Sequence, residues 1–215
     1  SCFSGTAARR SGNADGIKTE FLPPRLDSRG KGIPVRRILR MHDRDDTATP
    51  LILPNEAATL ALGASLAPLL SEKLVIYLEG DLGAGKTTLV RGLLRALGYA
   101  GKVKSPTYTF VELYAISRLD LYHFDFYRFE QPEEYLDGGF DEYFQSAAIC
   151  LVEWPDKAGS YLPPADVRLH FTITDDARMV AVSGESEEGR RCLTSWHFST
   201  DAPPAVTPSN LPPLR

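Results

Sequence analysis

Two stretches of the chain are apolar at every position over about the length of one β-strand. Residues 74–78 are Leu-Val-Ile-Tyr-Leu, and residues 147–152 are Ala-Ala-Ile-Cys-Leu-Val. Short continuous apolar runs are typical of strands with both faces covered, because a half-exposed strand alternates apolar and polar residues. We therefore expect these stretches to be central strands of an α/β domain.

The segments on either side of the first strand carry helical signals. Asn55 is a residue type that caps helices, and apolar residues recur after it at positions 58, 60, 62, 66, 69 and 70. This spacing predicts an amphipathic helix that packs on the sheet. A second helix is expected over residues 86–97, and Gly98 marks its C-terminal end.

Further strands are expected as two hairpins. Residues 101–117 begin as a Ser-Pro-Thr loop and continue as a strand rich in Val, Tyr and Phe, and residues 119–126 form its partner after a short turn. Residues 166–174 and 178–183 form the second pair. Between the hairpins, residues 132–145 are expected to form short helices interrupted by a Gly-Gly pair.

The two ends of the chain lack these patterns. Residues 1–45 are basic, and residues 201–215 contain five prolines, so we expect a disordered extension and tail around a domain at residues 46–200. Residues 184–200 carry no clear pattern. We interpret the extension as sequence upstream of a natural start near Met41, with a basic targeting segment as the alternative.

Composition and charge narrow the classes of function. The 215 residues are 43% hydrophobic and 24% charged, as in soluble globular proteins, and no apolar run approaches the roughly 20 residues of a membrane span. Residues 1–40 hold nine of the 24 basic but three of the 28 acidic residues, which leaves 15 basic and 25 acidic residues beyond them. A domain this acidic is a poor candidate for binding nucleic acid alone. The three cysteines have no metal-like spacing and predict free thiols in a reducing, cytoplasmic compartment.

A glycine-rich turn joins the first apolar strand to the second predicted helix. Residues 80–87, Gly-Asp-Leu-Gly-Ala-Gly-Lys-Thr, fit the phosphate-loop pattern G-x-x-x-x-G-K-[ST]. Glycines let the backbone approach phosphate closely, and its amide groups with the helix N-terminus form an anion site. Lys86 is expected to reach the β- and γ-phosphates, and the Thr87 hydroxyl to bind Mg²⁺. The alternative is an ordinary glycine-rich turn, but the flanking strand and helix favour nucleotide binding.

Two acidic residues are candidates to hold Mg²⁺ or to act on water. Glu153 directly follows the apolar run 147–152, where a phosphate-loop protein carries the acid that helps to hold its Mg²⁺, and Asp125 lies in the predicted strand 119–126. Either residue would otherwise be a surface or capping carboxylate. We favour a functional role for both, with Asp125 orienting water or holding Mg²⁺ through water.

The remaining candidates have structural alternatives of equal or greater weight. Ser105 and Thr107 offer hydroxyls where a switch loop would contact the γ-phosphate, or they belong to a simple Ser-Pro turn. His123 shares a strand face with Asp125, but a lone histidine on an aromatic strand is more often structural. Trp154 is expected to be a buried anchor rather than a residue that stacks on a ligand.

Together, these stretches resemble the bacterial TsaE-type ATPase, a small P-loop protein of tRNA threonylcarbamoyladenosine synthesis. The resemblance covers about residues 50–184 and rests on the segments GDLGAGKTTL, VKSPTYTFVELY, YHFDFYR, PEEY…GGFDEYF and ICLVEWPDKAG…LP. It implies a single-domain P-loop NTPase fold with a mixed sheet flanked by helices. It also implies an ATPase, weak alone, that works with two protein partners on the threonylcarbamoyl-transfer complex at adenosine 37 of tRNA and contacts tRNA only indirectly.

The resemblance also implies roles for the residues that match the family's motifs. Catalytic roles are implied for Lys86, Asp125 and Glu153, and Mg²⁺ binding for Thr87 and Glu153. The switch-like loop is formed by Ser105 and Thr107. Contacts to ATP are implied for Glu56, Gly83, Ala84, Gly85, Lys86, Thr87, Thr88, Ser105 and Thr107.

Two other functions use the same phosphate loop. A small-molecule kinase would pass the γ-phosphate to an acceptor, with Asp125 as the base, and would need that acceptor to consume ATP. A GTPase switch is disfavoured because no N-K-x-D tetrapeptide follows the apolar run 147–152. Sequence alone does not predict the oligomeric state.

Overall fold

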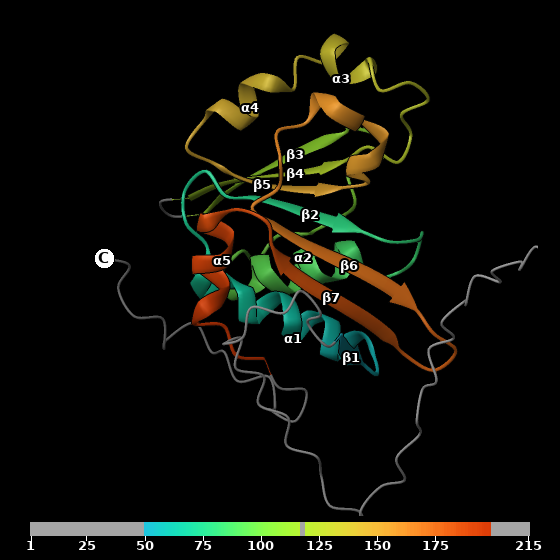
Figure 1. Ribbon diagram of the computed structural model, residues 1–215, viewed down its shortest axis with the longest axis vertical. Coiled ribbons are helices and arrows are strands. Elements are labelled where there is room, and N and C mark those ends of the chain that lie inside the picture. Colours follow the sequence, from blue (N-terminus) through green and yellow to red (C-terminus); the bar gives the residue numbers. More distant parts are fainter. Residues whose placement is uncertain (1–49, 117–118, 199–215) are drawn as a thin grey trace, which may run out of the picture. The chain divides into compact units, whose positions relative to one another are not determined.

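The computed structural model describes residues 50–116 and 119–198. The predicted extension 1–45 and tail 201–215 lie outside these residues. At the centre is a seven-stranded sheet with the strand order β1-β7-β6-β2-β5-β4-β3 (Figure 1). The strands are β1 (Leu51–Leu53), β2 (Val75–Glu79), β3 (Val111–Ile116), β4 (Leu119–Asp125), β5 (Ile149–Glu153), β6 (Val167–Ile173) and β7 (Arg178–Gly184).

The sheet is mixed, as the family resemblance implies. Strands β6, β2, β5 and β4 run parallel to one another. The hairpins β3–β4 and β6–β7 add an antiparallel strand on each side, and β1 pairs antiparallel with β7. Both predicted hairpins and both predicted central strands are confirmed.

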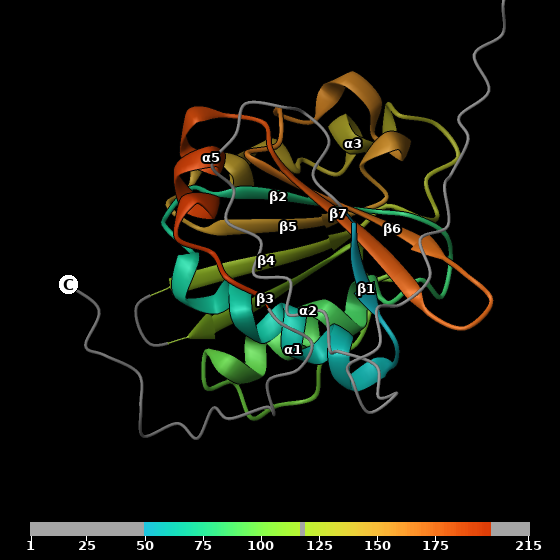
Figure 2. The same ribbon diagram turned by 60° about the horizontal axis from the view of Figure 1, so that its bottom comes forward.

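Helices cover both faces of the sheet (Figures 1 and 2). The helices are α1 (Glu56–Leu66), α2 (Lys86–Ala96), α3 (Glu134–Asp137), α4 (Asp141–Gln145) and α5 (Glu187–Thr194). Helix α1 begins as predicted, because the Asn55 side chain accepts a hydrogen bond of 2.9 Å from the Ala58 amide. The described helices include none long and apolar enough to span a membrane.

The alternation of side chains along β2 explains why its sequence is a continuous apolar run. Ile76 and Leu78 belong to the core layer that contains residues of α1 and α2, such as Leu93. Val75 and Tyr77 point to the opposite face, into a layer built largely of aromatic residues from β4 and the α3–α4 region. Successive strand residues face opposite sides of a sheet, so a strand covered on both faces is apolar throughout.

Helices α1 and α2 approach each other at two glycines. A Cβ atom on Gly63 would lie 2.0 Å from the carbonyl oxygen of Leu89, and one on Gly92 would lie 2.1 Å from that of Leu60. Neither distance is possible, so this packing requires glycine at both positions. The close approach fixes α1 beside the helix whose N-terminus carries Lys86 and Thr87.

We predict that Gly63→Ala lowers the free energy of unfolding by a net amount of about 2 kcal/mol. The added methyl group meets backbone atoms and forces the two helices apart, at a cost near the upper end of the range of about 1–3 kcal/mol for overpacking. Helix propensity acts in the opposite direction, favouring alanine over glycine by about 1 kcal/mol. Urea unfolding of the two proteins measures the difference. A variant as stable as the wild type would show that the helices do not need this contact.

Two elements were not predicted from the sequence. Strand β1 has three residues and pairs with β7, which is far away in the chain, so no local pattern reveals it. Helix α5 lies in the segment 184–200, where only Gly189 and Leu193 of the helix are buried. Its Ser186 cap, which accepts a hydrogen bond of 3.0 Å from the Gly189 amide, is the signal that could have revealed it.

Candidate functional site

Strand register brings the two candidate acids to one edge of the sheet. Leu78 of β2 lies opposite Glu153 of β5, and Glu153 lies opposite Asp125 of β4. All three strands are parallel, so their C-terminal ends meet at the same edge, where α/β proteins commonly bind ligands. The glycine-rich loop leaves β2 at this edge.

The loop has the backbone form that an anion site requires. Gly83 and Gly85 have φ angles of +79° and +106°, in the left-handed region that favours glycine. Gly85 is the N-cap residue of α2, and no side chain caps the helix there. The first amide groups of α2 therefore remain available to bind phosphate oxygens, with the positive end of the helix behind them.

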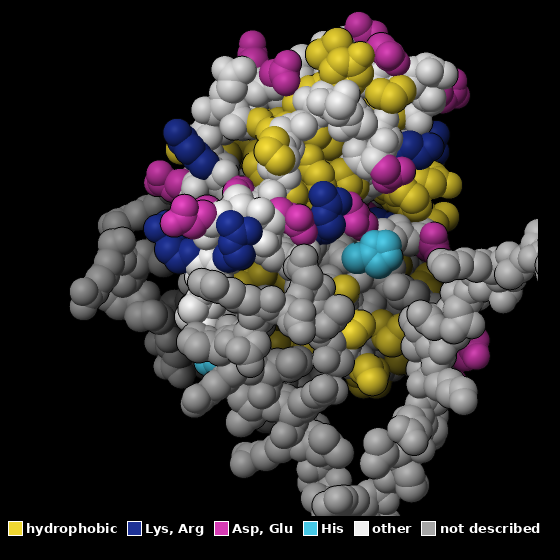
Figure 3. All heavy atoms as spheres, in the orientation of Figure 1, with side chains coloured by type: hydrophobic (Ala, Val, Ile, Leu, Met, Phe, Trp, Pro, Cys, Tyr) yellow, Lys and Arg dark blue, Asp and Glu magenta, His cyan; other side chains and the backbone are white. Residues whose placement is uncertain are grey.

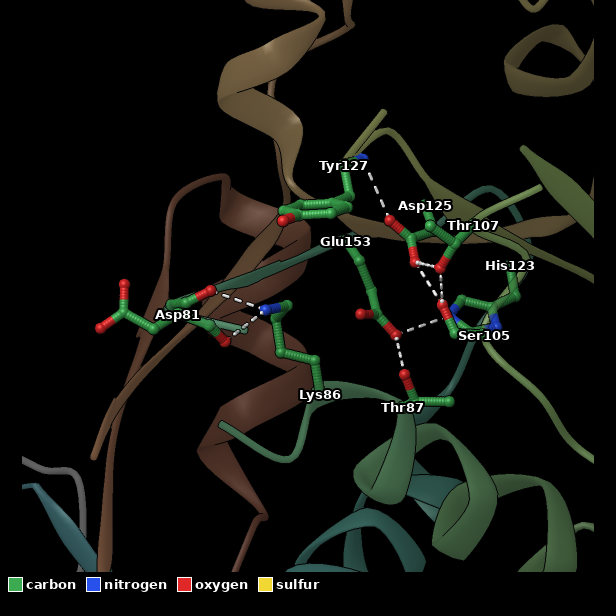
Figure 4. Close-up of polar contacts among 10 residues, drawn as sticks. Asp81, Lys86, Thr87, Ser105, Thr107, His123, Asp125, Tyr127 and Glu153 are labelled. Atoms are coloured by element: carbon green, nitrogen blue, oxygen red, sulfur yellow. Dashed lines mark hydrogen bonds and ion pairs between the residues drawn. The ribbon is translucent and has the colours of Figure 1, made fainter. Parts of the chain in front are cut away.

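Lys86 lies at the bottom of this loop with 4% of its surface exposed. Its ammonium donates hydrogen bonds of 2.6 Å and 2.9 Å to the carbonyl oxygens of Gly80 and Asp81 (Figure 4). Burial lowers the pKa of Lys86, and the carboxylates of Glu153 and Asp125 partly oppose that shift.

Trp154 covers the lysine. Its backbone has a φ angle of +57°, in a region that residues other than glycine rarely adopt. This turn follows Glu153 directly and brings the indole ring to 4.2 Å from the Lys86 ammonium, as a cation–π contact. The Trp154 ring also lies 5.0 Å from that of Tyr127. Trp154 is half-buried and lines the site, so it is not the fully buried anchor expected from the sequence.

Glu153 receives two hydrogen bonds on one oxygen. The Thr87 hydroxyl donates to Glu153 Oε1 over 2.7 Å, and His123 Nε2 lies 2.9 Å from the same atom (Figure 4). Glu153 is 3% exposed and His123 is fully buried. Residues from α2, β4 and β5 thus converge on a single carboxylate.

Asp125 organises the Ser-Pro-Thr loop. Its Oδ2 atom accepts hydrogen bonds from the Ser105 hydroxyl and, over 2.6 Å, from the Thr107 hydroxyl. Its Oδ1 atom accepts one of 3.0 Å from the Tyr127 amide. The two hydroxyls also lie 2.6 Å from each other, so the loop is held against the end of β4.

A cavity opens between these groups. It is lined by Leu82, Gly83, Ala84, Gly85, Lys86, Thr87, Thr88, Ser105, Thr107, Asp125, Tyr127, Glu153 and Trp154. Two residues that the sequence marks as candidates are outside this lining: Glu56, the first residue of α1, and His123, which is fully buried. The Glu56 carboxylate instead pairs with Arg91 at 3.3 Å, so its contact with a nucleotide stays a prediction.

The sequence did not single out Leu82, Tyr127 or Arg178. Leu82 lies inside the phosphate-loop motif, directly before Gly83, and Tyr127 lies two residues after Asp125. That adjacency is the signal that could have found them. Arg178 begins β7, and its guanidinium lies 3.4 Å from the Gly83 carbonyl oxygen. A Cβ on Gly85 would contact its Cδ atom at 3.5 Å. No motif includes Arg178, since the pairing of β7 with β6 and β1 brings it to the loop.

The cavity suits a hard divalent cation bound together with phosphate. Glu153 and Thr87 offer a carboxylate and a hydroxyl oxygen within 2.7 Å of each other, and Mg²⁺ prefers such ligands when phosphate oxygens complete its coordination. Within the described ranges no group of three or more His, Cys, Asp and Glu side chains forms an all-protein metal site. The residues present therefore fit a metal that arrives with a nucleotide.

The surface in Figure 3 intermixes charges of both signs. Acidic and basic side chains lie next to each other across the middle of this face, and apolar side chains gather above them over the α3–α4 region. For example, Arg168 of β6 forms ion pairs with Glu79 and, at 3.8 Å, with Glu185. The described part of this face therefore does not present the continuous basic surface typical of proteins that bind nucleic acid directly.

Comparisons with known proteins find similarity to one protein family. A family model described as threonylcarbamoyl adenosine biosynthesis protein TsaE matches residues 53–180. A Haemophilus influenzae protein named tRNA threonylcarbamoyladenosine biosynthesis protein TsaE is 42% identical over 149 residues, which cover 67% of this chain and 94% of that protein. A Bacillus subtilis protein of the same name is 45% identical over 109 residues, covering 49% and 66%. The crystal structure of Bacillus subtilis YdiB matches with a TM-score of 0.53 and 31% identity, covering 68% of this chain and 94% of that one.

Proposed function

The chain belongs to the TsaE family of tRNA threonylcarbamoyladenosine biosynthesis, with a P-loop NTPase α/β fold, and we propose that it is the Mg²⁺-dependent ATPase subunit of that machinery. In this role it binds and hydrolyses ATP to support turnover of the threonylcarbamoyl-transfer complex at adenosine 37 of tRNA. The observation that carries the proposal is the convergence of Lys86, Thr87 and Glu153 on one cavity beside the loop amides.

In this proposal, the glycine-rich loop binds the triphosphate. The amide groups at the start of α2 donate to phosphate oxygens, and the Lys86 ammonium exchanges its contacts with the Gly80 and Asp81 carbonyls for the β- and γ-phosphates. Because Lys86 is already buried, its charge acts at low local dielectric, where attraction to phosphate is stronger than in water. Arg178, whose guanidinium lies next to the Gly83 carbonyl oxygen, is a further candidate contact.

Thr87 and Glu153 would hold Mg²⁺, which when bound neutralises charge on the β- and γ-phosphates. The carboxylate and the hydroxyl already lie in hydrogen-bond contact, so little rearrangement is needed to present both oxygens to a cation. Glu153 thereby takes the role of the acid that, together with the loop threonine, holds Mg²⁺ in a phosphate-loop protein.

Asp125 serves hydrolysis from the other wall of the cavity. Its carboxylate holds the hydroxyls of Ser105 and Thr107, both of which line the cavity. In the proposed role, these groups orient the attacking water and sense the γ-phosphate as a switch-like loop does.

The partners that we propose are two proteins of the tRNA threonylcarbamoyladenosine-synthesis complex, with tRNA contacted only through them. The excess of acidic residues beyond residue 40 supports protein partners rather than direct phosphate binding. Cys150 and Cys192 are free thiols, which supports the cytoplasm as the compartment.

ATP hydrolysis measured with and without the two partner proteins tests this function. We expect slow hydrolysis by the chain alone and at least about tenfold faster hydrolysis in the complex, which corresponds to a barrier lower by about 1.4 kcal/mol. Equal rates would contradict the role as a subunit. Dependence of ATP consumption on an added small-molecule acceptor would instead identify a phosphotransferase.

A further inference from the structure

His123 is completely buried, yet it is polar and lies among apolar neighbours. It projects from β4 toward the same side of the sheet as Leu121, and Leu151 of β5 lies directly opposite it. A leucine at this position would fill the same layer without burying any polar atom. The histidine therefore needs an explanation other than packing.

The imidazole ring has one hydrogen-bond partner. Its Nε2 atom lies 2.9 Å from Glu153 Oε1, and within the described chain its buried Nδ1 atom has no partner. An ionised carboxylate only accepts, so Nε2 carries the hydrogen that is donated to Glu153. Leaving Nδ1 unpartnered costs stability. What histidine supplies in return, and leucine would not, is the bond to Glu153.

That bond is one of two that meet on the same oxygen of Glu153. Thr87 and His123 both donate to Oε1, from α2 on one side and from β4 on the other. Figure 4 shows the second carboxylate oxygen turned away from His123 and toward the side of the cavity where Lys86 lies. With one oxygen held by two donors, the second is presented to the cavity in a defined direction.

We propose that His123 is a positioning residue that holds Glu153 in the orientation needed to bind Mg²⁺ with the nucleotide; this inference rests on the proposed function of the site. His123 touches neither nucleotide nor metal and acts only through Glu153. Groups that orient a metal ligand in this way typically change metal affinity about 10- to 100-fold when they are removed.

Variants whose side chains at position 123 differ in length and in hydrogen-bonding capacity test this role. His123→Gln places an amide donor near the position of Nε2, whereas His123→Asn is equally polar but too short to reach Glu153. His123→Leu removes the donor and retains the volume. The dissociation constant of a fluorescent ATP analogue is measured for each protein in MgCl₂ and in EDTA, and circular dichroism checks the fold.

We expect wild type and His123→Gln to bind the analogue more tightly in MgCl₂ than in EDTA, with ratios of the two constants that agree within about threefold. In His123→Asn and His123→Leu the ratio is expected to fall about tenfold or more, while the constant in EDTA stays within about twofold of wild type. If the role of His123 is purely structural, its replacement weakens binding of the analogue equally in MgCl₂ and in EDTA, or the ratio of the two constants falls as far in His123→Gln as in His123→Asn.

The outcomes separate this inference from the function on which it rests. If wild type binds equally in MgCl₂ and EDTA, the Mg²⁺-dependent site itself is refuted, and the role of His123 with it. If wild type shows the Mg²⁺ effect and His123→Asn keeps it in full, the site stands and only the positioning role is overturned.

Discussion

Replacement of Lys86 by alanine is expected to weaken ATP binding by about 100-fold or more, since two charge-assisted hydrogen bonds to phosphate, each contributing about 1.5–3 kcal/mol, are lost. The side chain is buried under Trp154, and among the described residues that line the cavity it is the one lysine. Isothermal titration with ATP and Mg²⁺ measures the loss. Lys86→Met, which keeps the aliphatic stem and removes only the charge, is expected to lose as much.

Lys102→Ala is the matched control for this experiment. Lys102 is exposed and does not line the cavity, so its removal changes the net charge equally without touching the site. We expect it to bind ATP with an affinity within about twofold of wild type, because exposed charges at a distance are screened. If Lys86→Ala binds ATP as tightly as Lys102→Ala, the assignment of residues 80–87 as a phosphate loop is wrong.

Replacement of Glu153 by glutamine is expected to slow ATP hydrolysis in the partner complex by about 100- to 1,000-fold, the loss typical of removing one electrostatic group from a transition state. The amide oxygen can still accept hydrogen bonds from Thr87 and His123, so the fold of the site is kept while the negative charge is lost. Affinity for ATP in EDTA should not fall. Single-turnover hydrolysis at saturating enzyme measures the rate of the chemical step separately from the affinity for ATP.

Glu79→Gln provides the comparison. Glu79 ends β2 as Glu153 ends β5, but its carboxylate pairs with Arg168 and does not line the cavity. Because a partly exposed ion pair contributes about 0–1 kcal/mol, we expect this variant to fold and to hydrolyse ATP at nearly the wild-type rate. Similar losses in the two variants would mean that Glu153 has no special role in hydrolysis.

The sequence predicts those parts of the fold whose signals are local. The β2 strand, the glycine-rich loop and α2 are contiguous, and each carries its own pattern of apolar spacing, glycines or capping. The continuous apolar run of β5 predicts a buried strand, and the residue after such a run falls at the C-terminal edge of the sheet. The amino-acid pattern therefore suffices to place Glu153 near the loop.

Other parts of the site depend on strand order, which no local pattern encodes. Arg178 reaches the loop because β7 pairs with β6 and β1, and the contact of Arg178 with Gly83 spans 95 residues of chain. His123 and Glu153 meet because β4 and β5 are neighbours with a register that sets His123 diagonal to Glu153. The sequence by itself therefore does not distinguish His123 from an ordinary core histidine.

The most direct test of the account is the structure of the chain crystallised with a non-hydrolysable ATP analogue and Mg²⁺. We expect the β-phosphate within hydrogen-bond distance of the amides of residues 83–88, the Lys86 ammonium on the phosphates, and the metal between Thr87 and Glu153. A triphosphate bound elsewhere on the protein, or an analogue absent at saturating concentration with the loop unchanged, would contradict the account.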